Sequence, residues 1–243
     1  MISGRAPGWS ALAAAFALAA CASNAKPAEE DAFVTAFRVV RPSVVLFTMK
    51  IPSDDPKKKG QWDDAYGSGV IVGSGAWGSR ILTVEHVIED ARDLHVTIAE
   101  KTVAPARVIA SDKKADLALV ETSKPNLPAV TLSTAVGVQP GTAIGIAGFP
   151  IPDAFADEGL GVATSVYAGR VSSIRKGALE LDLAIIPGES GGPVFDARTG
   201  AVIGLAESRF EEEKAIGFAI PIDLARTFLA KHERHAADPN GVK

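Results

Sequence analysis

The chain has 243 residues, a formal net charge of −4 at pH 7 and 47% hydrophobic residues. This length and apolar content are sufficient for packed cores, either in one all-β barrel pair or in two small domains. The net charge shows no basic bias, and no stripe of Lys and Arg is interleaved with aromatic residues, so we expect no nucleic-acid partner. A single cysteine excludes an internal disulfide.

The N-terminal segment has the pattern of an export signal. Arg5 precedes an apolar run at residues 11–20, which is too short to span a hydrocarbon core of about 30 Å as a helix. Leu18-Ala19-Ala20-Cys21 resembles the bacterial lipobox and predicts a mature protein of 223 residues (243 − 20) that begins at an acylated Cys21. Two or more acyl chains anchor a protein stably to a membrane. The other interpretation is an ordinary secretory signal with an incidental cysteine.

These features predict an exported, lipid-anchored protein, periplasmic or at the surface of a bacterial cell. The residue after Cys21 is Ala22 and not the usual inner-membrane retention residue. This difference favours an anchor in the outer membrane. We expect residues 1–20 to be the signal, residues 21–30 to be a tether and residues 31–243 to form the folded part.

The folded part begins with a helix and continues as short strands. Residues 31–40 predict an amphipathic helix, residues 44–49 a strand and residues 53–64 a charged surface loop. The next β-branched and aliphatic runs predict strands at 70–72, 81–84, 94–98, 103–109 and 117–120. Two prolines within residues 124–128 interrupt this series, because they cannot continue a strand ladder.

A second series of strands follows. The expected strands are 142–146, 165–174, 178–185, 193–195, 201–207 and 215–220. Residues 151–168 form a long loop, which is either a gate over a cleft or an ordinary surface connection. Residues 222–235 predict a terminal helix.

Ser190 lies between glycines, in Gly188-Glu189-Ser190-Gly191-Gly192-Pro193. A hydroxyl at its free pKa is a poor nucleophile, so a catalytic role requires a base and a carboxylate elsewhere. His86 and Asp116 each interrupt an apolar run, where a polar group is costly unless it is hydrogen-bonded. We therefore expect Ser190 to give its proton to His86 while Asp116 accepts from the other ring nitrogen.

Three other polar residues compete for functional roles. Asp112 is the main alternative to Asp116, but it lies in a polar turn where a carboxylate caps backbone amides. His232 and His235 share a face of the terminal helix, yet no Cys or carboxylate set accompanies them, so we expect no metal site.

The serine block also fits the Gly-x-Ser-x-Gly nucleophile elbow of α/β-hydrolases, and Asp223 and His235 follow it in the required order. An elbow needs a helix directly after the serine, whereas residues 193–204 predict strand, turn and strand. With 53 residues after Ser190 (243 − 190), this esterase interpretation is disfavoured.

The order His86, Asp116, Ser190 and the block around the serine resemble the trypsin-like (chymotrypsin-fold) serine proteases, with a departure at Glu189. Further motifs narrow the resemblance to the HtrA/Deg type. They are Tyr66–Val72, Ile81–His86, Gly148-Phe149-Pro150 and Ile216–Pro221. The resemblance covers roughly Val39 to Ala230, and several motifs in order are far more specific than one Gly-x-Ser-x-Gly.

The resemblance implies an all-β fold of two antiparallel six-stranded β-barrels, at about residues 40–124 and 129–221, with the active site in the cleft between them and a C-terminal helix. It implies a serine endopeptidase that cleaves unfolded or misfolded envelope proteins through His86, Asp116 and Ser190. The backbone N–H groups of Gly188 and Ser190 would form the oxyanion hole. No cofactor is expected, and a homo-trimer is left open. Many relatives carry a PDZ domain, and we expect none here, because few residues follow the expected terminal helix before Lys243.

In that fold the base of the first specificity pocket lies six positions before the nucleophile, here at Ala184, with Ile185 beside it. Neither residue is acidic, so we expect cleavage after small or aliphatic residues rather than after Lys or Arg. Pro187 is unusual for the family and restricts the backbone beside Gly188, which predicts an oxyanion loop that is competent without an activator. Glu189 replaces the usual Asn or Asp, and we expect it either to steer a subsite or to be exposed. The alternative from another class is a catalytically idle binding module or chaperone.

Overall fold

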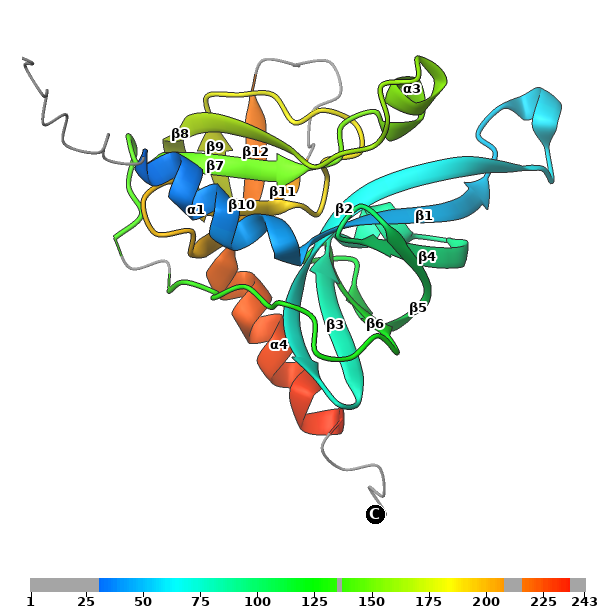
Figure 1. Ribbon diagram of the computed structural model, residues 1–243, viewed down its shortest axis with the longest axis horizontal. Coiled ribbons are helices and arrows are strands. Elements are labelled where there is room, and N and C mark those ends of the chain that lie inside the picture. The colour runs from blue at the N-terminus through cyan, green and yellow to red at the C-terminus, as the bar shows by residue number, and fades with distance from the viewer. Residues whose placement is uncertain (1–30, 135–136, 208–215, 237–243) are drawn as a thin grey trace, which may run out of the picture. The chain divides into compact units, whose positions relative to one another are not determined.

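The computed structural model describes residues 31–134, 137–207 and 216–236. The expected signal at 1–20, Cys21 and the tether at 21–30 lie outside the described residues. Two closed barrels of six antiparallel strands and a C-terminal helix make up the fold (Figure 1). This confirms the predicted fold class. Within the described ranges, no helix is both long and apolar enough to cross a membrane.

The first barrel has the strand order β1-β2-β3-β6-β5-β4. Its strands are β1 Val44–Pro52, β2 Trp62–Gly75, β3 Gly78–Thr83, β4 Arg92–Ile98, β5 Thr102–Asp112 and β6 Leu117–Thr122. The short helix α2 (Glu85–Ile88) follows β3 directly. Phe47, Ile71 and Leu119 are among the fully buried side chains that fill this barrel.

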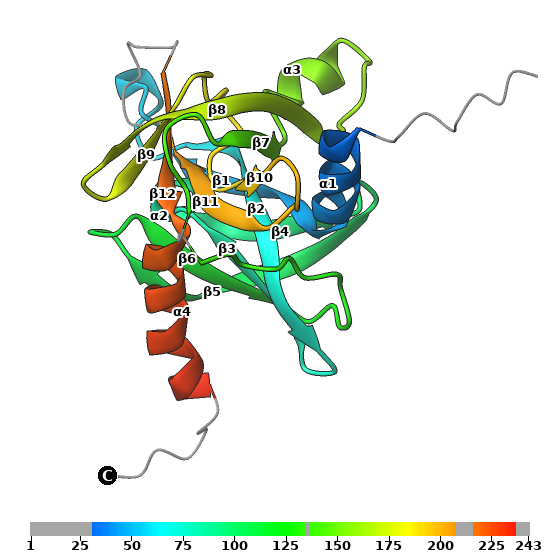
Figure 2. The ribbon, with the colours of Figure 1, turned by 90° about the vertical axis from the view of Figure 1, so that its left-hand side faces the viewer.

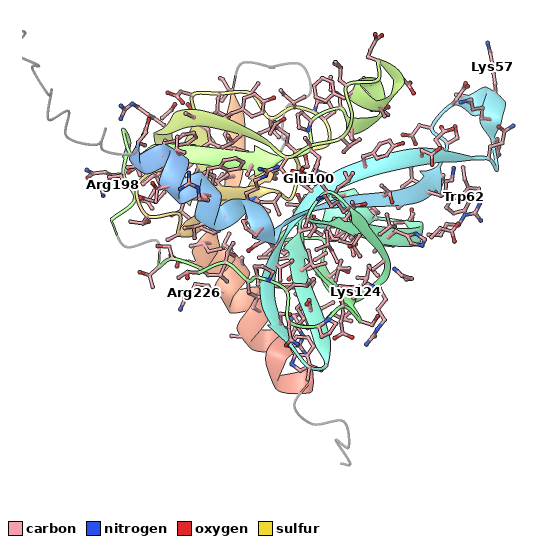
Figure 3. All side chains as sticks on the ribbon, viewed as in Figure 1. Lys57, Trp62, Glu100, Lys124, Arg198 and Arg226 are labelled. Atoms are coloured by element: carbon pink, nitrogen blue, oxygen red, sulfur yellow. The ribbon has the colours of Figure 1, made fainter. Side chains whose placement is uncertain are left out.

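The β1–β2 hairpin is longer than the sequence predicts, because β2 begins at Trp62 inside the expected loop 53–64. Side-chain contacts support these charged strand ends. Lys50 Nζ lies 2.7 Å from Asp64 Oδ1, and the Arg92 guanidinium lies 3.3 Å from the centroid of the Trp62 ring. The rest of the expected loop contains a 3₁₀ turn, η2 (Pro56–Lys58), and Figure 3 shows Lys57 at the far end of the hairpin.

The second barrel has the strand order β10-β11-β12-β9-β8-β7. Its strands are β7 Ala143–Gly148, β8 Ser165–Arg175, β9 Ala178–Leu181, β10 Pro193–Asp196, β11 Val202–Glu207 and β12 Gly217–Pro221. Ile144, Ile146 and Val194 belong to its buried core. β9 ends four residues before the predicted limit of 185, and the chain then runs as a loop towards Ser190.

Helices cover both barrels. α1 (Ala32–Val40) buries Ala36 and Val40, and η1 (Arg41–Ser43) leads from it into β1. α4 (Ile222–Ala236) follows the second barrel but places buried residues in the same core cluster as the first-barrel strands. Figure 2 shows the two helices on different sides of the barrels. α4 therefore helps to hold the barrels together.

Glu100 joins the first barrel to the long loop of the second. It lies in the turn between β4 and β5, and its carboxylate accepts from the Arg41 guanidinium at 2.9 and 3.1 Å and from the Thr164 N–H at 2.9 Å. Thr164 directly precedes β8, and Figure 3 shows Glu100 between the barrels. The loop before β8 contains a short helix, α3 (Pro152–Asp157), and the bond from the Thr164 N–H to this carboxylate holds its C-terminal end.

Candidate active site

His86 and Asp116 form a pair held by two hydrogen bonds. His86 lies in α2, and Asp116 directly precedes β6 in a left-handed conformation with φ of 51°. The Asp116 Oδ1 atom accepts the His86 backbone N–H at 2.9 Å, and Oδ2 lies 2.8 Å from His86 Nδ1. One carboxylate thus fixes both the backbone and the ring of the histidine.

His86 and Asp116 each shift the pKa of the other towards its charged form. Burial opposes protonation of the His86 ring, but the hydrogen bond and the negative charge of Asp116 outweigh it and raise the pKa of His86. Burial likewise opposes ionisation of Asp116, yet its bonds to His86 keep the pKa of Asp116 below its usual value. Asp116 is therefore ionised at neutral pH, Nδ1 donates to it, and Nε2 is left to act as a base.

Asp112 has a different position. Its Oδ1 atom accepts the backbone N–H groups of Lys114 and Ala115 at 3.0 and 3.1 Å, which caps the turn before β6. In the part of the chain that the structure describes, no group of three or more His, Cys, Asp or Glu side chains is placed to hold a metal ion.

Ser190 comes from the second barrel, just before Gly191, Gly192 and β10. It shares a cavity of about 360 Å³ with His86 and Gly188, which first-barrel residues including Tyr66 also line. Over the described ranges, no hydrogen bond links the Ser190 hydroxyl to His86. Catalytic hydrogen bonds are often long before substrate binds and tighten in the complex, so the shared cavity is the relevant observation.

A tight turn precedes the serine. The Glu189 N–H donates to the Ile186 carbonyl at 2.9 Å, Pro187 is the second residue of the turn and Gly188 is the third, with φ of 96°. Proline followed by a residue with positive φ is the pattern of a type II turn, in which the third position favours glycine. A Cβ at Gly188 would also lie 2.3 Å from the Phe149 carbonyl oxygen.

This turn fixes the direction of the Gly188 amide. The Pro187 carbonyl accepts the Ile151 N–H at 2.8 Å, and in a trans peptide the carbonyl and the N–H point in opposite directions. The Gly188 N–H therefore points away from Ile151. Among the described residues neither Gly188 N–H nor Ser190 N–H has an acceptor, so both amides are available to a ligand.

Glu189 is buried, with an exposed fraction of 1%, so the expectation that it steers a subsite or is exposed is wrong. Its Oε2 atom accepts the Ile186 N–H at 2.8 Å, while Oε1 has no hydrogen-bond partner in the described structure. Burial raises the pKa of Glu189 to about 7, and the bond from Ile186 acts in the opposite direction. The carboxyl holds the start of the turn that Gly188 completes.

Ala184 and Ile185 lie before this turn and do not line the cavity that contains Ser190. Ile185 packs against the second-barrel core, and a Cβ added at Gly217 would lie 3.1 Å from its Cγ1 atom. Both side chains are partly exposed. Their role in substrate choice stays a prediction.

The residues around the site match a known family model. Residues 67–205, more than half of the chain, match the model described as a trypsin-like peptidase domain. The chain belongs to that family. It is a peptidase domain of the HtrA type, as the following relatives and structures indicate.

A putative serine protease HhoB from Synechocystis sp. is 32% identical over 187 residues, which cover 72% of this chain and 41% of that protein. A probable periplasmic serine endoprotease, DegP-like, from Pseudomonas putida is 30% identical and is covered over 35% of its length. The HtrA-type protease AlgW with tripeptide aligns with a TM-score of 0.68 and 27% identity, over 84% of this chain and 64% of that one. The chain spans about two fifths or less of the length of these two curated relatives.

Proposed function

We propose that the protein is a serine endopeptidase in which Ser190 is the nucleophile, His86 the general base and Asp116 the residue that orients the base. The observation that carries this proposal is the pair of hydrogen bonds from Asp116 to the backbone and ring of His86, beside a cavity shared with Ser190. The remaining ring nitrogen of His86 is the one that takes the serine proton.

The catalytic steps follow from these positions. Ser190 attacks a peptide carbonyl and gives its proton to His86 Nε2, and His86 then returns the proton to the leaving amine. The backbone N–H groups of Gly188 and Ser190 stabilise the oxyanion. The Pro187-Gly188 turn and the Ile151 bond support a hole that is formed without an activator.

For substrates, we propose unfolded or misfolded polypeptides of the cell envelope, cut after small or aliphatic residues. The support is the apolar character of Ala184 and Ile185, together with relatives whose names describe periplasmic serine endoproteases. A lipid anchor at Cys21 completes the proposal, and mass spectrometry of the mature N-terminus tests it. An unmodified Cys21 or cleavage elsewhere would exclude the anchor.

Labelling with a fluorophosphonate tests the proposed function. The wild type and a Ser172→Ala control, which removes an exposed hydroxyl on β8, should both be labelled without any added peptide, and Ser190→Ala should not. Absence of label on the wild type would favour the idle binding module. Sequencing of the N-termini released from casein by wild type and Ser190→Ala would then define the residue before the cut, and a majority of Lys or Arg would contradict the proposed preference.

A further inference from the structure

Ser68 makes contacts that the proposed mechanism has not used. It lies in β2 of the first barrel and is fully buried, with an exposed fraction of 0%. Its hydroxyl donates to the Gly188 carbonyl at 2.7 Å and accepts the Phe149 N–H at 3.0 Å. Its backbone N–H donates to the Ser190 carbonyl at 2.9 Å. A single first-barrel residue therefore contacts the two residues whose amides would bind the oxyanion.

We propose that Ser68 is a positioning residue for the oxyanion hole, acting through Gly188 and Ser190. This inference rests on the proposed function. Both peptide groups that flank the Gly188 Cα are held. Ile151 N–H holds the Pro187 carbonyl of the first, while the second is held by the Ser68 hydroxyl on the Gly188 carbonyl and by the Glu189 N–H on the Ile186 carbonyl. Fixing both peptide planes fixes the φ of 96° at Gly188 and hence the direction of its N–H.

The packing around Ser68 leaves little room for another arrangement. A Cβ at Gly191 would lie 2.2 Å from the Ser68 carbonyl oxygen, one at Gly148 would lie 3.0 Å from its hydroxyl oxygen, and one at Gly192 would lie 3.3 Å from its Cβ. The Ser68 carbonyl also accepts the Thr83 hydroxyl at 2.8 Å. Ser68 is thus held in place, and removing its hydroxyl leaves the Gly188 carbonyl without its donor and the Phe149 N–H without its acceptor.

Ser79 is a matched control. It is also a fully buried first-barrel serine, and its hydroxyl donates to the Lys124 carbonyl at 2.6 Å and bonds to the Ser74 hydroxyl at 2.5 Å. It does not line the cavity of Ser190. Ser79→Ala therefore removes an equally buried hydroxyl and its hydrogen bonds without touching the turn.

The test compares kcat, KM and a transition-state analogue in the full chain. The substrate is a peptide that the wild type cleaves, and the analogue is a peptide trifluoromethyl ketone with the same residue before the cut, whose adduct places an oxyanion in the hole. Ser68→Ala should lower kcat on the order of 10²-fold with KM changed less than about threefold, because the oxyanion contact is made in the transition state. The inhibition constant of the ketone should rise by the factor by which kcat/KM falls. Ser79→Ala should change each value less than about threefold.

Several outcomes would overturn the inference. They are an unchanged kcat in Ser68→Ala, a rise in KM alone, or a loss that Ser79→Ala reproduces. If Ser68→Ala does not fold, Ser68→Cys, which keeps the number of heavy side-chain atoms and replaces the hydroxyl with a bulkier and weaker donor, must show the loss of kcat in folded protein. A wild type that neither cleaves nor labels refutes the proposed function and this inference together, whereas an active wild type with an active Ser68→Ala refutes the inference alone.

Discussion

Glu189→Gln should make the protein more stable relative to wild type as the pH rises. Gln has nearly the same shape and keeps an oxygen that can accept the Ile186 N–H, but it does not ionise. In the wild type, burial raises the pKa of Glu189 from its ordinary value of 4.5 to about 7. Burial is the cause of the rise and the Ile186 bond only opposes it, so no charged group in the described structure offsets the buried carboxylate.

The sign follows from proton binding. Between pH 4.5 and about 7 the unfolded chain has lost the Glu189 proton while the folded chain keeps it, so the unfolding free energy falls as the pH rises. Above about pH 7 Glu189 is ionised in both the folded and the unfolded chain, so its effect on the unfolding free energy no longer changes with pH. At about 1.36 kcal/mol for each pH unit, the wild type should lose about 3 kcal/mol relative to Glu189→Gln across this range.

Urea unfolding at pH 4.5, 5.5, 6.5, 7.5 and 8.5 measures this difference. The other titrating groups cancel between the two proteins, and the new amide adds an offset that does not depend on pH. Glu158→Gln, at an exposed site just after α3, is the control and should show a constant difference from wild type. A constant difference for Glu189→Gln as well would refute the argument that a buried carboxyl without a cation holds the turn.

Three further changes test the site and the fold. Gly188→Ala should lower kcat on the order of 10²- to 10³-fold, because φ of 96° and contact with the Phe149 carbonyl exclude a Cβ; wild-type kcat would contradict the proposed oxyanion hole. Wild-type kcat/KM should rise with pH through a His86 pKa above 6.5, and Asp116→Asn should move this limb to lower pH while kcat falls on the order of 10⁴-fold; an unmoved limb in a pH–rate profile would contradict the pairing. Glu100→Ala should cost about 1 to 2 kcal/mol of unfolding free energy in urea and leave kcat within about threefold of wild type, and an unchanged unfolding free energy would show that its bonds to Arg41 and Thr164 contribute nothing.

The barrels are predictable because their strands are apolar runs separated by Gly, Pro and Asp. The hairpin end at Trp62–Asp64 is not, since its charged sequence has the composition of a loop and is supported by contacts with Lys50 and Arg92 on other strands. The short helix α3 is missed because six residues carry too little periodic pattern to identify a helix.

The candidate site, like the fold, is only partly predictable from the sequence. The positions of His86, Asp116 and Ser190 can be proposed from motif order. From the sequence we expect Pro187 to restrict the backbone beside Gly188, and the structure shows that this restriction takes the form of a type II turn. Glu189 is misjudged because carboxylates are rarely buried, and its acceptor role depends on a backbone group three residues earlier. The contact between Ser68 and Gly188 joins residues 120 positions apart, so the local sequence pattern cannot predict it. The sequence shows only that Ser68 is a polar residue in a run that becomes buried.

The division of the site between two barrels has a consequence for biosynthesis. His86 and Asp116 both lie in the first barrel. Ser190 follows His86 by 104 positions (190 − 86) and is brought into place by strands of the second barrel. Contacts of such long sequence separation form late in folding, and domains fold from the N-terminus during synthesis. We therefore expect a nascent chain to carry the proposed base without the proposed nucleophile, and so to be unable to cut itself while its unfolded segments are most exposed to cleavage.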